Sequence, residues 1–265
     1  MSRLKIENNP SFQEFSNNIK GAKSIKQIAF FLIPFSKTAK NIVQSFEGFQ
    51  AIEKQFNLIS KSPDEFNDFF SASGWIAHES MNHDLMLECI ALAKNKDIKT
   101  AEEKLADYYT SENLKWLTRQ LKSTPEFQKR YELIRLAYED TIAQRFHSAV
   151  PVVLMIIDGG VNDIDKNKGF FTETTDLTAW DSIAAHSTGL SRLRDILNKG
   201  RNRTNTEEIF LPYRNGILHG RDIAYANKHV AAKCWLTLIA INDWGKALEK
   251  NKKNPLKEAK EQLLK

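Results

Sequence analysis

The stretch YELIRLAYEDTIAQRFHSAVPVVLMIID (residues 131–158) carries the clearest structural pattern in this chain. Hydrophobic side chains recur in it every three or four residues, at Tyr131, Ile134, Tyr138, Ile142, Phe146, Ala149, Val153 and Ile156. That spacing is the period of an α-helix with one buried face. The stretch therefore predicts one long helix, which Pro151 kinks because proline removes a backbone hydrogen bond.

The same rhythm appears on both sides of this stretch. A second segment has hydrophobic or small residues at helical spacing at Val230, Cys234, Leu238, Ile241, Gly245 and Leu248. Further helices are expected over residues 25–33, 37–58, 63–94, 101–122 and about 178–199, with capping boxes at Thr100–Glu103 and Thr178–Asp181. The β-branched run 150–153 contains a proline and does not predict a strand. We therefore predict an all-α protein.

Composition bounds the class of protein. A chain of 265 residues with 42% hydrophobic residues can bury a substantial core. Its net charge of +5 is compatible with a nucleic-acid partner without requiring one. Cys89 and Cys234 lie in apolar runs and indicate reduced core thiols. The most apolar early run, residues 28–35, is far shorter than the roughly 20 residues that a membrane span needs. We expect a cytoplasmic protein with no membrane partner.

A possible catalytic motif lies in FLPYRNGILHGRD, residues 210–222, where Arg214, Asn215 and His219 fall as Arg-Asn-x-x-x-His. An arginine can hold two phosphoryl oxygens, and a histidine with a pKa near 6.5 exchanges protons at neutral pH. Asn215 can orient His219 or bind the phosphate. A ribonuclease that uses the 2′-OH of RNA as nucleophile needs such groups and no metal. Gly216 within a helix suggests a close approach by another group at that turn.

The motif and its flanks resemble the HEPN domains of larger anti-phage and abortive-infection proteins. The resemblance includes the helix that runs from Ala149 through an apolar segment to Asp158 and Gly159. It implies a helical bundle over residues 124–250. Before and after that bundle, the sequence itself predicts a helical region of unknown role at 1–123 and a Lys-rich tail at 251–265. The resemblance places the active site on Arg214, Asn215 and His219, with no cofactor and no metal.

The resemblance also implies partners. HEPN domains usually pair as two-fold dimers, and a dimer would supply a second His219 to a reaction that wants both an acid and a base. The expected function is a metal-independent endoribonuclease in prokaryotic defence or a toxin system, with RNA as substrate and a neutralising or sensor protein as a further partner. One alternative is a non-catalytic HEPN-like module that binds a nucleotide or a partner protein. Another is a helical scaffold in which Arg214 forms a salt bridge and His219 caps a helix.

Charged residues elsewhere leave several interpretations open. A basic cluster before the motif is either a track that binds the RNA backbone or a solvated helix end. It contains Arg192, Arg194, Arg201 and Arg203, and with Arg221 these form the predicted RNA-binding set. Asp158 is expected to cap or to pair near the motif helix, and Asp163 and Asp165 to lie in a solvated loop. His78 and His83 are five residues apart, which does not fit a zinc-protease helix and favours a polar helix face.

Overall fold

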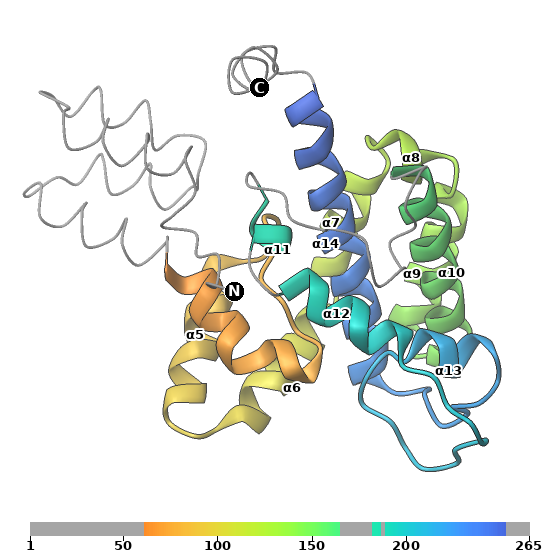
Figure 1. Cartoon of the computed structure of the whole chain (residues 1–265), viewed down its shortest axis with the longest axis horizontal. Coiled ribbons are helices and arrows are strands. Elements are labelled where there is room, and N and C mark those ends of the chain that lie inside the picture. The colour runs from red at the N-terminus through yellow and green to blue at the C-terminus, as the bar shows by residue number, and fades with distance from the viewer. Residues whose placement is uncertain (1–60, 165–181, 187–188, 253–265) are drawn as a thin grey trace, which may run out of the picture.

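The computed structural model describes residues 61–164, 182–186 and 189–252, and these form a helical protein (Figure 1). No strand occurs within those ranges, and the only extended pairing there is a parallel bridge between Asn205 and Asp222. The predicted all-α class is therefore confirmed for this part of the chain. The helices predicted over residues 25–33 and 37–58 lie outside the described residues.

The centre of the fold is α14, Lys228–Lys252, drawn in blue in Figure 1. Every residue from 230 to 244 is buried, including four polar ones, so this helix is enclosed on all sides instead of showing one apolar stripe. It packs against α6, Ile98–Tyr108, and α10, Phe146–Ile164, and also contacts α7, Asn113–Leu121, and α11, Ile183–His186. The periodic pattern predicted the helix, and the general hydrophobicity of its sequence explains its central position.

The single helix predicted from residue 131 is wrong, because the chain forms two helices there. They are α9, Tyr131–Ile142, and α10, Phe146–Ile164, which pack against each other. Gln144 between them has a φ of 57°, a left-handed conformation that ends a helix, and Arg145 N–H donates to the carbonyl of Asp140. Hydrophobic spacing continues across the turn because both helices bury their faces in the same core. Pro151 lies inside α10 as predicted.

Close packing at the far end of α10 requires small residues. A methyl group added to Gly160 would lie 2.7 Å from the ring carbon Cζ of Phe127, which belongs to the short helix α8, Pro125–Gln128. Arg130 crosses the adjacent Gly159 and donates to Asp163 at 2.7 Å, so Asp163 is a paired residue of α10 and the prediction that it lies in a solvated loop is wrong. These contacts fix the segment of α10 that carries Asp158.

The N-terminal side also contains more breaks than predicted. The expected helix 63–94 is interrupted after residue 70 by the 3-10 turn η2, Ser71–Ser73, and an irregular segment to Asn82, whose side chain caps α5. The expected helix 101–122 is also divided, and Asp97, not Thr100, caps its first part. The helices observed are α5, His83–Lys94, α6, Ile98–Tyr108, and α7, Asn113–Leu121.

Three shorter helices complete the described fold. Within the predicted helix 178–199 the structure has α11, Ile183–His186, and α12, Gly189–Asn198; the predicted capping box at Thr178–Asp181 lies outside the described residues. The motif forms α13, Arg214–Leu218, which contacts α12 and α10. One cluster of buried hydrophobic side chains extends from Phe66 to Trp244, so residues before and after position 123 share a core. The HEPN-like arrangement of 124–250 stays a prediction.

Candidate functional site

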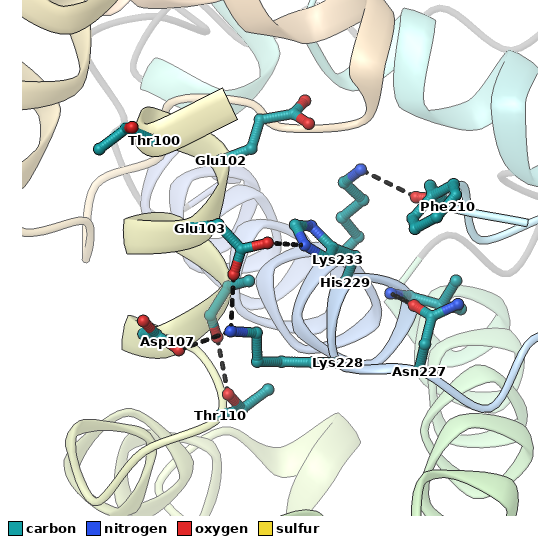
Figure 2. A network of polar contacts seen from close by, with 12 residues as sticks. Thr100, Glu102, Glu103, Asp107, Thr110, Phe210, Asn227, Lys228, His229 and Lys233 are labelled. Carbon is teal, nitrogen blue, oxygen red and sulfur yellow. Dashed lines mark hydrogen bonds and ion pairs between the residues drawn. The ribbon is translucent and has the colours of Figure 1, made fainter. Parts of the chain in front are cut away.

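The motif lies on a short helix whose approach is firmly anchored. Pro212 and Tyr213 are buried immediately before α13, and Ile217 is buried within it. Upstream, the ammonium group of Lys233 donates to the carbonyl of Phe210 at 2.8 Å, as Figure 2 shows, and Asn227 donates to the carbonyl of Ile209 at 2.8 Å. Lys233 lies on α14 and Asn227 directly precedes it, so the central helix positions the motif.

Arg214 and Asp158 form an ion pair between α13 and α10. The Nε group of Arg214 donates to Asp158 Oδ2 at 3.0 Å, and Nη2 donates to the same oxygen. The two side chains are 24% and 22% exposed, so solvent screens the pair only in part. The prediction that Asp158 pairs near the motif helix is confirmed. Its second oxygen, Oδ1, is buried and accepts no hydrogen bond from the described residues.

Asn215 orients Arg214, not His219. Its side-chain oxygen accepts from Arg214 Nη1 at 2.7 Å, while its amide donates to the carbonyl of Asn198 at 2.8 Å. Asn198 is the last residue of α12, so Asn215 also attaches the motif helix to the end of that helix. The guanidinium is thus held from two sides, by a carboxylate and by an amide.

His219 is exposed and directly follows α13. It caps that helix through its backbone, whose N–H donates to the carbonyl of Asn215 at 3.2 Å. The imidazole makes no hydrogen bond or ion pair with any described residue. The ion pair of Arg214 and the capping position of His219 are the features that the scaffold alternative expects, but the cap does not use the ring, which stays accessible to a ligand.

The predicted RNA-binding residues differ in their surroundings. Arg192, Arg203 and Arg221 are exposed. Arg194 lies within 3.4 Å of Asp195, and its side chain is only 12% exposed. Arg201 binds the buried carboxylate of Asp222 and lies over the ring of Tyr213, its guanidinium 5.0 Å from the ring centre. Sequence reasoning did not identify Asp222 as important, since its partners lie 17 and 21 residues away.

A second polar network joins α6 to α14 and lies beside Phe210, which Lys233 contacts (Figure 2). Glu103 accepts from Lys228 at 2.7 Å and is hydrogen-bonded to His229 at 2.8 Å; these two partners lower the pKa of Glu103 to about 2. Burial lowers the pKa of Lys233 to about 8, and the negative charge of Glu102 opposes that shift. The Lys233 ammonium also lies 4.9 Å from the ring centre of Trp75. Within this network, Lys233 contacts the motif segment directly, at the carbonyl of Phe210.

The interpretation of His78 as part of a polar helix face is wrong. Residues 75–78 are not helical, and the His78 ring is buried between Asp243 on α14, at 3.0 Å, and the Tyr109 hydroxyl, at 2.7 Å. Ser80 donates to Asp243 through both its backbone and its hydroxyl. His78 therefore connects three segments of the fold, namely its own, the end of α6 at Tyr109, and α14 at Asp243.

Both cysteines are free and buried, as predicted, and burial raises the pKa of Cys89 to about 12. Among the described residues, no group of three or more His, Cys, Asp or Glu side chains is arranged to hold a metal ion. None of the described helices is long and apolar enough to cross a membrane. No family model, curated protein or solved structure matches this chain.

Proposed function

We propose that this chain is a metal-independent endoribonuclease that cleaves RNA through attack of the 2′-OH on the adjacent phosphate. The observation that supports it most is the meeting of Arg214 with Asp158. These residues belong to two segments, 56 residues apart, that resemble HEPN domains in sequence. His219, five residues after Arg214 in the sequence, offers an exposed imidazole. The role in prokaryotic defence or a toxin system rests on the resemblance alone.

Each motif residue has a chemical role in this proposal. His219 transfers a proton to or from the reacting ribose and phosphate oxygens, as an imidazole can do at neutral pH. Arg214 stabilises the negative charge that grows on the phosphorane. Asn215 and Asp158 hold the guanidinium in one orientation, so that little reorganisation is needed when the charge develops. The Arg214 guanidinium then contacts the substrate phosphate and Asp158 at the same time.

A two-fold dimer completes the proposed site. Each chain supplies one motif histidine, whereas transesterification needs a base for the 2′-OH and an acid for the leaving 5′-oxygen. A second His219 across the two-fold axis provides the missing group. Mixing wild-type chains with an excess of His219→Ala chains should then suppress activity, because most wild-type chains would sit in heterodimers. Activity that simply follows the number of wild-type chains would contradict the shared site.

The proposal is separated from the non-catalytic alternative by one assay. Purified protein is incubated with single-stranded RNA in excess EDTA, and the same reaction is run with His219→Ala. The proposal expects cleavage by the wild type and none by the variant. If neither protein cleaves, while both bind a nucleotide with equal affinity, the chain is a binding module. Cleavage that EDTA abolishes and a divalent cation restores contradicts the metal-independent mechanism.

A further inference from the structure

The turn that follows the motif contains a fully buried charge. Asp222 is 0% exposed, although it lies three residues after the exposed His219. Aspartate is rarely found inside a protein unless its charge is paired, because desolvation of a carboxylate is costly. A buried ion pair adds little net stability compared with hydrophobic residues of the same size. Its presence at this position therefore points to a role in fixing a conformation.

The carboxylate of Asp222 is held by two side chains from the segment before the motif. Arg201 Nε donates to Oδ1 at 3.1 Å and lies 3.3 Å from Oδ2, and Asn205 Nδ2 donates to Oδ1 at 3.0 Å. The guanidinium of Arg201 also covers the ring of Tyr213, the residue that precedes α13. Arg201 thus contacts the chain on both sides of the motif helix, at Tyr213 before it and at Asp222 after it.

Gly216 in the middle of α13 receives the same carboxylate. A methyl group at Gly216 would lie 2.8 Å from the Asp222 carboxyl carbon and closer still to Oδ2. The backbone also approaches Gly216, since the N–H groups of Arg221 and Asp222 both donate to the carbonyl of Gly216, at 2.7 and 2.9 Å. The close approach expected at Gly216 therefore comes from within the chain, not from a second copy.

His219 lies at the outer end of the loop that these contacts close. The backbone leaves α13 at His219, reverses at Gly220, whose φ is 66°, and returns to Gly216. Because the imidazole has no side-chain partner among the described residues, its place depends on this backbone path. We propose that Asp222, held by Arg201, is a positioning residue that fixes the turn presenting His219 to RNA. This inference rests on the proposed function of His219.

The test compares catalysis with a direct signal from the histidine ring. Asp222→Ala removes the carboxylate, Arg201→Gln breaks the same contact from its exposed side, and Asp222→Asn retains the shape. The readouts are kcat and KM on single-stranded RNA and the imidazole ¹H–¹³C resonances of His219, assigned with His219→Ala. Asp97→Asn is the matched control, because it removes one negative charge and asparagine also caps a helix well.

We expect Asp222→Ala to lower kcat by about 10²-fold, the loss typical of a catalytic group displaced by about 1 Å, and to leave KM unchanged. The His219 resonance should shift or split in Asp222→Ala and in Arg201→Gln, and should stay close to its wild-type position in Asp222→Asn. Asp97→Asn should change neither readout. A folded Asp222→Ala protein with wild-type kcat and an unmoved His219 resonance overturns the inference, even if its unfolding free energy has fallen.

Two further outcomes remain decisive. If Asp222→Ala does not fold, Arg201→Gln decides by the same two readouts, because the exposed side of the contact tolerates a polar replacement. If the wild-type protein does not cleave RNA, the proposed ribonuclease function fails, and the His219 resonance alone decides whether Asp222 positions the ring. An unmoved resonance in folded Arg201→Gln and Asp222→Ala then overturns the positioning role as well.

Discussion

Replacing Gly216 with alanine tests the packing of the motif helix with a single methyl group. Alanine normally stabilises a helix interior by about 1 kcal/mol compared with glycine. Gly216 has no left-handed backbone that would require glycine, since only Gly74 and Gly220 among the described glycines have positive φ. The expected penalty therefore comes only from the carboxylate of Asp222, which occupies the space that the methyl group needs.

The size of that penalty follows from the contacts. Forcing an extra methyl group into a packed interior costs about 1–3 kcal/mol. If the carboxylate moves away, it also loses a hydrogen bond to a charged partner, which contributes about 1.5–3 kcal/mol. Subtracting about 1 kcal/mol of helix propensity leaves a net destabilisation of about 3 kcal/mol for Gly216→Ala. Gly200→Ala, with no atom within 4 Å of the added methyl group, is the matched control and should be neutral or slightly stabilising.

Urea unfolding followed by circular dichroism measures these differences, and an unchanged m-value shows that the transitions are comparable. A double-mutant cycle identifies the cause. In an Asp222→Ala background the oxygen that collides with the methyl group is absent, so Gly216→Ala should cost nothing or even stabilise there. An equal cost in both backgrounds, or no cost in the wild type, would refute the assignment of Asp222 as the group that fills the space beside Gly216.

Three further predictions concern individual side chains. His219→Ala should abolish cleavage and change the unfolding free energy by less than about 0.5 kcal/mol, because the ring is exposed, whereas Arg214→Ala should abolish cleavage and also lose stability, since it leaves Asp158 unpaired. Asp158→Asn should lower kcat and keep RNA affinity in a binding titration, because the guanidinium loses orientation but keeps its charge. Lys233 has a folded-state pKa of about 8 against an ordinary 10.5, so the folded state binds fewer protons between these values, and wild-type stability should rise relative to Lys233→Met as pH increases from about 8 to 10.5. A constant difference in unfolding free energy between those two proteins over that pH range would show that burial does not shift the pKa of the Lys233 amine.

The local pattern of hydrophobic residues predicted where helices occur better than it predicted where each helix ends. The spacing of hydrophobic side chains identified α9, α10 and α14, because burial of one face leaves a periodic trace in the sequence. The turn at Gln144 leaves no such trace, since glutamine rarely adopts a left-handed backbone and neither glycine nor proline marks the position. The irregular segment around His78 was missed for a similar reason: its conformation is set by Asp243, 165 residues later.

The candidate site was predictable only where the motif itself carried the information. Arg214 and His219 follow from their residue types and spacing, and the pairing of Asp158 followed from its place at the end of an apolar run in the sequence. The role of Asp222 did not, because Arg201 and Asn205 reach it through a loop whose path no periodicity records. Lys233 was equally hidden, since a lysine on a helix is usually solvated, and here it is buried against Trp75 and the Phe210 carbonyl.

The chemistry assigned to Arg214 and His219 determines which chemical groups are left at the ends of the cleaved RNA. Single-stranded RNA is incubated with the wild-type protein in excess EDTA, and the products are identified by mass spectrometry. Attack by the 2′-OH predicts a 2′,3′-cyclic phosphate on one fragment and a 5′-hydroxyl on the other, with no products from His219→Ala. Fragments that carry a 5′-phosphate and a 3′-hydroxyl, or equal cleavage by the variant, would show that Arg214 and His219 do not catalyse attack by the 2′-OH.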